Sequence, residues 1–149
     1  MMTYPNAAAG LKTLYQARLV GLISIVLVIV PIVQVLAVAA MLIAGFLALV
    51  GLAQCRKDDK GYRTAFNMVI AGLVTNLAAS LVSAYAGAEG FAGICGNILS
   101  IATDVLSLAS LYFVCITTNR LLKETAAAEN LIDRGIVVWK LNVVCTVIL

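Results

Sequence analysis

An uncharged stretch of 37 residues, 19–55, constrains this chain more than any other feature. As one helix it would be about 55 Å long at 1.5 Å per residue, whereas the hydrocarbon core of a bilayer is about 30 Å thick. Pro31 interrupts helical hydrogen bonding within the stretch, and the strongly polar side chain of Gln34 follows it. The stretch therefore predicts a tight hairpin of two membrane helices, at about residues 17–31 and 34–54.

The composition places the whole chain in a membrane. Hydrophobic residues make up 63% of the sequence, charged residues make up 11%, and the mean hydropathy is +1.08. This is far more apolar surface than a soluble core of this size could bury. We therefore expect an all-α, polytopic transmembrane helix bundle that forms a single domain over residues 1–149. Beyond the hairpin, helices are expected at about 64–86, 93–117 and 136–149, with a cytoplasmic helix at about 119–134.

The placement of positive charge predicts the orientation in the membrane. If residues 19–55 form a hairpin of two spans, all ten Lys and Arg fall on one side of the membrane, and Glu89 is the charged residue on the other side. With a single first span, Lys12 and Arg18 would lie opposite the other eight, contrary to the positive-inside rule. We therefore expect a cytoplasmic N-terminus in an integral protein of a bacterial cytoplasmic membrane.

The last predicted helix is short. After Lys140 only nine residues remain, which is roughly half a bilayer at helical rise. We expect a partial fifth span that continues beyond Leu149 in a longer chain.

A carboxyl group, Asp104, lies near the middle of the fourth predicted span. Polar residues recur there at intervals of three and four, which places them on one helix face: Asn97, Ser100, Asp104 and Ser107. The third predicted span has a similar face: Gly72, Asn76, Ser80 and Ser83. Counted from the nearest cytoplasmic charges, Asn76 and Asp104 lie about 20 and 24 Å deep at helical rise. We therefore expect a direct hydrogen bond between them.

Two interpretations of Asp104 stay open. In the structural one, it is a hydrogen-bonded lock between spans of a scaffold or a subunit of a membrane assembly. In the functional one, it lines a path for protons, cations or a polar solute in a small channel or transporter. Acids within a membrane are functional by default, but the chain is short and lacks a second buried ionisable group or a discontinuous helix of the transporter kind. The structural interpretation is the leading one.

Small residues predict where the helices pack. The second predicted span carries a ridge of them, spaced for close backbone approach: Ala37, Ala40, Ala44, Ala48 and Gly51. This ridge indicates an interface, within the chain or between copies. Besides the lipid bilayer, the expected partners are a second copy or another membrane protein.

Other function classes find no support in the sequence. There is no histidine, the four cysteines have no CxxC spacing, and we expect buried thiols and neither a metal nor a cofactor. Catalytic motifs are absent, and one buried carboxyl does not form an acid–base pair, so we expect no enzyme. Basic runs with interleaved aromatics are also absent, so nucleic acid is not an expected partner. The pair Asp58 and Asp59, set among basic residues, is interpreted as a solvated, self-neutralised turn.

Overall fold

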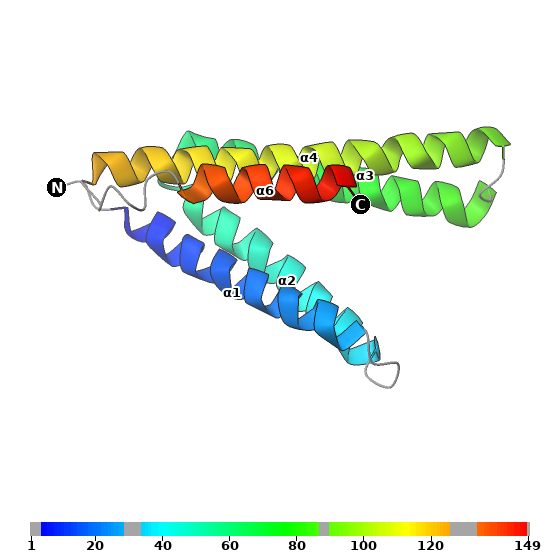
Figure 1. Ribbon diagram of the computed structural model, residues 1–149, viewed down its shortest axis with the longest axis horizontal. Coiled ribbons are helices and arrows are strands. Elements are labelled where there is room, and N and C mark those ends of the chain that lie inside the picture. Colours follow the sequence, from blue (N-terminus) through cyan, green and yellow to red (C-terminus); the bar gives the residue numbers. More distant parts are fainter. Residues whose placement is uncertain (1–3, 29–33, 87–89, 126–133, 149) are drawn as a thin grey trace. The chain divides into compact units, whose positions relative to one another are not determined.

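The computed structural model describes residues 4–28, 34–86, 90–125 and 134–148. Over these ranges the chain forms five helices and no strand (Figure 1). Four of the helices are long and apolar enough to cross a membrane. The prediction of an all-α protein with membrane-spanning helices is confirmed at this level. The chain divides into two compact units, Thr3–Arg63 and Thr64–Leu149, which are described separately below.

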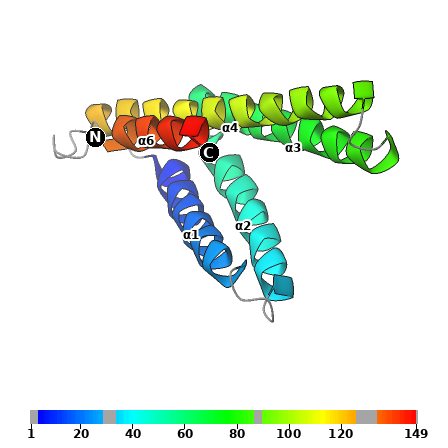
Figure 2. The ribbon, with the colours of Figure 1, turned by 45° about the vertical axis from the view of Figure 1, so that its right-hand side comes forward.

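The first unit is a helical hairpin. Its helices, α1 (Pro5–Val28) and α2 (Gln34–Cys55), lie side by side (Figures 1 and 2). They are antiparallel, because Gly10 near the start of α1 contacts Gly51 near the end of α2. The predicted division of the uncharged stretch into two helices is therefore confirmed. The turn predicted at Pro31 lies outside the described residues.

The first helix begins well before the predicted span at residue 17. Pro5 occupies its first position, where the missing proline N–H costs nothing. The alanines that follow favour helix strongly. The helix therefore begins before the apolar segment and includes polar and charged residues. Hydropathy alone predicted the apolar part of α1 and missed the part that carries Lys12.

The hairpin is held by a close backbone contact. A Cβ placed at Gly10 would lie 2.5 Å from the carbonyl oxygen of Gly51 and would also meet the sulfur of Cys55. A Cβ at Gly51 would lie 2.8 Å from the carbonyl oxygen of Gly10 and 3.0 Å from Cγ of Leu14. Glycine at both positions allows the two backbones to approach this closely. Gly51, the last residue of the predicted small-residue ridge, therefore lies in the interface within the hairpin.

The rest of that ridge shares the face of α2 that carries Gly51. Ala40, Ala44 and Ala48 are half-buried, and the side chain of Ala37 lies outside the described part of the chain. The thiol of Cys55 is fully buried beside this face, and its sulfur lies 3.7 Å from the carbonyl oxygen of Ala7.

The two aspartates after α2 cap the starts of two helices. Asp58 accepts hydrogen bonds from the backbone N–H of Ala7 and from the side-chain amide of Asn6, both at 2.7 Å. Asp59 accepts one from the backbone N–H of Gly61 at 2.6 Å, in the first turn of α3. Carboxylates satisfy the orphan N–H groups there and interact favourably with the helix dipole. Residues 56–58 form a turn, as predicted, but the two carboxylates are half-buried and accept hydrogen bonds at helix starts, so the prediction that they are solvated is wrong.

The second unit contains most of α3 (Lys60–Ala86), together with α4 (Gly90–Glu124) and α6 (Arg134–Ile148). Helices α3 and α4 run side by side in both ribbon views (Figures 1 and 2). They touch where a Cβ on the buried Gly72 would lie 3.7 Å from Cβ of Leu106. Helix α6 packs on α4, where a Cβ on Gly135 would lie 3.5 Å from Cβ of Cys115.

The end of α4 differs from the expected one. Helix α4 continues to Glu124 without a break, so residues 119–124 of the predicted cytoplasmic helix belong to it. Thr118 is compatible with this continuation because its hydroxyl donates to the carbonyl oxygen of Val114 at 2.7 Å within the helix. Residues 126–133 of the predicted helix lie outside the described ranges. Helix α6 has 15 residues, fewer than a full transmembrane helix needs.

Candidate functional site

The candidate site is the polar face of α4 around Asp104. The four residues predicted to share this face are all exposed in the structure: Asn97, Ser100, Asp104 and Ser107. Large apolar side chains surround the carboxyl, since Ile101 is 63% and Val105 is 59% exposed. The site is therefore a short polar stripe on an otherwise apolar surface.

Helix α3 packs against the other side of α4. Its contact there is with Leu106, which lies two residues, or about 200°, around the helix from Asp104. The residues that share the Leu106 face, including Leu99, Ala102 and Phe113, are half-buried, in agreement with this packing. Asp104 consequently points away from α3.

The expected hydrogen bond between Asn76 and Asp104 is not formed. The contact between Gly72 and Leu106 places the two residues within about 3 Å of one level, because Asn76 follows Gly72 by four residues and Asp104 precedes Leu106 by two. The two residues therefore lie at a common level along the two helices, as the residue count predicted. The prediction that the two polar faces meet was wrong, because both side chains are exposed, and the structure describes both without a bond between them.

The other polar residues predicted on α3 also fail to meet Asp104. Ser80 is exposed, and its hydroxyl donates to the carbonyl oxygen of Asn76 at 3.0 Å within its own helix. The side chain of Ser83 lies outside the described residues. Among the side chains that the structure describes, the polar faces of α3 and α4 do not combine into one site.

Helix α6 packs on the continuation of the Asp104 face, at residues of α4 that follow Asp104. Leu108, Tyr112 and Cys115 follow Asp104 at intervals of four, four and three, so they continue its stripe. The indole N–H of Trp139 donates to the carbonyl oxygen of Leu108 at 3.1 Å. The Trp139 and Tyr112 rings meet edge to face, with centroids 5.1 Å apart and an interplanar angle of 61°.

The end of α6 does not provide a partner for the carboxyl. Since Gly135 lies at Cys115 and Trp139 at Leu108, the helices are antiparallel and Asp104 falls near the level of residues 143–146. The amide of Asn142 donates to its own helix at the carbonyl of Val138, at 3.0 Å. The hydroxyl of Thr146 donates to the carbonyl of Asn142 at 2.9 Å. No described residue donates a hydrogen bond to Asp104.

The contact between α4 and α6 was missed by the sequence analysis. Gly135 and Trp139 are four residues apart, and this small-then-aromatic pair was the available signal. In the described residues no group of three His, Cys, Asp or Glu side chains could hold a metal ion. Comparison with models of known families, with curated proteins and with solved structures finds no match.

Proposed function

We propose that this protein is a non-enzymatic subunit or scaffold of a membrane assembly, and that the polar stripe of α4 binds a transmembrane helix of another chain. The observation that supports this is the position of Asp104. Its carboxyl is exposed on an apolar surface, faces away from α3 and has no donor among the described residues.

Physical chemistry favours a partner helix for such a group. A carboxyl that faces acyl chains at the centre of a membrane helix costs about 2.5–3.5 kcal/mol on insertion scales. A polar side chain on a neighbouring helix recovers about 0.6–2 kcal/mol through a hydrogen bond. The serines beside Asp104 are small enough to let a helix backbone approach the stripe closely. A second copy of this chain or another membrane protein would meet these requirements.

The proposed orientation follows from charge. Lys and Arg precede α2, follow it, and return after α4, so the N-terminus and these connections lie on the cytoplasmic side. This is the arrangement of an integral protein of a bacterial cytoplasmic membrane. The apolar surface of the helices then contacts lipid.

A small channel or transporter is the second candidate. The stripe from Asn97 to Ser107 is continuous and exposed over about 15 Å of helix, so two or more copies would enclose a polar path between them. Asn76 and Ser80, on α3, would line a separate face. This candidate predicts ion flux into liposomes that Asp104→Asn abolishes, whereas a scaffold shows no flux in either form.

The test of the subunit proposal is the mass of the particle that is extracted in a mild detergent. Asp104→Leu should reduce the particle to the single chain, whereas Asp104→Asn, which can still hydrogen-bond, should retain part of the assembly. Asn76→Leu is the matched control, because Asn76 is an exposed polar residue at the same level on α3. A wild-type particle that is already a single chain, or an assembly that survives Asp104→Leu, would contradict the proposal.

The same variants separate assembly from folding. Because Asp104 has no partner among the described residues, Asp104→Leu should change the free energy of unfolding of the single chain by less than about 0.5 kcal/mol. A lock within the chain would instead make this variant clearly less stable.

A further inference from the structure

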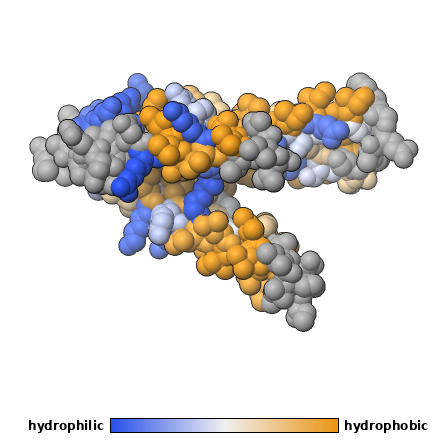
Figure 3. All heavy atoms as spheres, viewed as in Figure 1, coloured by the Kyte–Doolittle hydropathy of each residue, from blue (hydrophilic) through white to orange (hydrophobic). Residues whose placement is uncertain are grey.

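Apart from Tyr15, the exposed large apolar side chains among the described residues of the hairpin lie in the half near its turn. On α1 the exposed large apolar side chains beyond Tyr15 run from Leu19 to Val26, and on α2 they run from Val35 to Phe46. From residue 47 to residue 55 every side chain of α2 is buried or half-buried. In Figure 3 the surface of the hairpin is accordingly blue, or hydrophilic, at the end away from its turn and orange, or hydrophobic, further along towards the turn.

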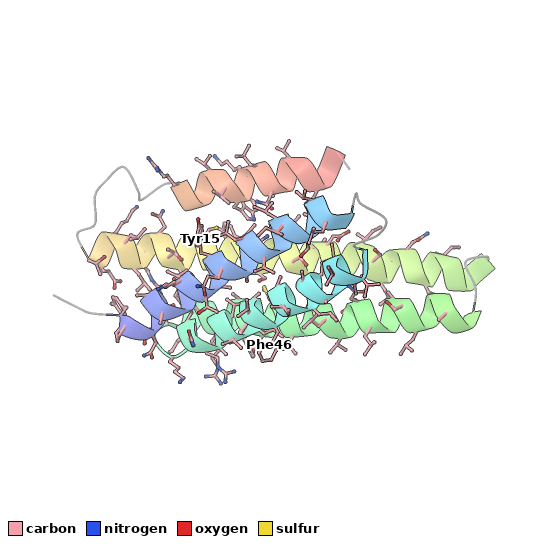
Figure 4. All side chains as sticks on the ribbon, turned by 90° about the horizontal axis from the view of Figure 1, so that it is seen from below. Tyr15 and Phe46 are labelled. Carbon is pink, nitrogen blue, oxygen red and sulfur yellow. The ribbon has the colours of Figure 1, made fainter. Side chains whose placement is uncertain are left out.

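The apolar surface begins at one level on both helices. Gly10 contacts Gly51 and Cys55. Because the two helices are antiparallel, a residue eight positions after Gly10 on α1 lies level with residues eight positions before Gly51 and Cys55 on α2. Arg18 therefore lies level with about residues 43–47, which include Phe46. Figure 4 labels side chains on both helices near this boundary, Tyr15 on α1 and Phe46 on α2, which are 64% and 67% exposed.

The part of the hairpin that carries exposed apolar side chains is shorter than the hydrocarbon core is thick, although α2 as a whole, uncharged from Gln34 to Cys55, is long enough to cross a membrane. From Arg18 to the end of α1 at Val28 is about 15 Å at helical rise, and from Phe46 to the start of α2 at Gln34 is about 18 Å. Five residues, 29–33, connect the two helices. Divided equally, they would lengthen each side of the hairpin by at most about 9 Å even if fully extended. The hydrocarbon core is about 30 Å thick, and one leaflet supplies about half of it.

The other half of the hairpin suits the headgroup region. Lys12 and Arg18 on α1, and Lys57 and Arg63 after α2, are exposed. Cations at this level attract the phosphates of anionic lipids, and the amphipathic ring of Tyr15 is of the type found among headgroups. Helix α1 meets the length of a span only if Lys12 and Arg18 are counted within Pro5–Leu27.

From these observations we propose that the α1–α2 hairpin enters one leaflet of the bilayer, from the side of its basic residues, and turns back near the bilayer centre. Its partner is the acyl region of that leaflet, with anionic headgroups around the basic half. A hairpin that crossed the bilayer would draw the exposed guanidinium of Arg18 towards the hydrocarbon, which is unfavourable. We refer to this half-inserted hairpin, α1 with α2, as the wedge. It leaves the N-terminus and the connection after α2 on the same side of the membrane.

The depth of the hairpin turn tests this proposal. Trp139 is the single tryptophan, so Trp139→Phe gives a background in which one inserted tryptophan reports its own depth. Val35→Trp places the reporter at the start of α2, where the native side chain is 82% exposed and a larger ring fits. Two controls calibrate the scale: Val74→Trp within α3 marks the bilayer centre, and Ile94→Trp near the start of α4 marks the opposite interface.

The variants are reconstituted in vesicles of phosphatidylcholine and phosphatidylglycerol whose acyl chains are brominated at different depths. If the wedge is correct, bromines near the acyl-chain ends quench the tryptophan fluorescence of Val35→Trp at least twofold more strongly than bromines near the headgroups do. Val74→Trp should show the same depth dependence. Strongest quenching by bromines near the headgroups, as for Ile94→Trp, would overturn the proposal.

Discussion

The backbone N–H of Ala7 donates a hydrogen bond of 2.7 Å to Oδ2 of Asp58, across 51 positions of the sequence. Tyr4, which precedes the helix, has no short side chain that could cap it, so the first turn of α1 obtains its acceptor from the connection after α2. This carboxylate joins the two ends of the hairpin.

Asp58→Ala should therefore loosen the first turn of α1 and lower the free energy of unfolding by about 1–2 kcal/mol, the range for a lost helix cap. Hydrogen exchange at the amides of Ala7 and Ala8 should accelerate. Lys57→Ala is the control, since Lys57 is exposed and its side chain has no described partner. Asp59→Ala should accelerate exchange at the start of α3 instead, and acceleration at Ala7 in that variant would contradict this assignment.

The glycine contact in the hairpin gives a prediction with two internal controls. Gly10→Ala would drive a methyl group into the Gly51 carbonyl, so we expect a loss of about 1–3 kcal/mol despite the higher helix propensity of alanine. A Cβ at Gly21 or Gly45 meets no neighbouring atom within 4 Å. Gly21→Ala and Gly45→Ala should be neutral or stabilising by up to about 1 kcal/mol. Thermal unfolding in detergent measures all three, and equal effects would argue against the close contact.

The contact between α4 and α6 predicts a specific role for one indole N–H. Trp139→Phe keeps an aromatic ring beside Tyr112 and removes the bond to the Leu108 carbonyl, which should cost about 0.5–1.5 kcal/mol. Tyr112→Phe also removes one polar atom from this contact, but the structure shows no hydrogen bond to that hydroxyl within the described residues, so it should be neutral. A neutral Trp139→Phe would show that ring packing alone holds α6.

Charge and hydropathy were enough to predict the four long helices of this chain, but not all of their ends. Helix α2 begins at the predicted residue and ends one residue later than predicted, because Arg56 follows it directly. The start of α1 was missed because a hydropathy limit marks the edge of the apolar segment, whereas the helix itself continues through alanines to Pro5. The continuation of α4 through Thr118 was missed for the same reason.

The candidate site was predicted in part. Spacing correctly grouped the four polar residues of α4 on one face, and counting residues gave Asn76 and Asp104 a common level. Spacing does not determine which face meets a neighbour, and the contact of Leu106 with Gly72 turned Asp104 away from α3. The bond from Asp58 to α1 joins residues far apart in sequence, so local patterns could not predict it.

The central claim is that the Asp104 face of α4 binds a helix from another chain. The most direct measurement is photo-crosslinking in native membranes, with a benzoylphenylalanine placed at Ile101, an exposed position beside Asp104. Leu77 on α3, which is also 63% exposed, is the control position. We predict one protein adduct of defined mass from position 101, its loss in Asp104→Leu, and none from position 77. Adducts with lipid alone at position 101, or a protein adduct that persists in Asp104→Leu, would contradict the claim.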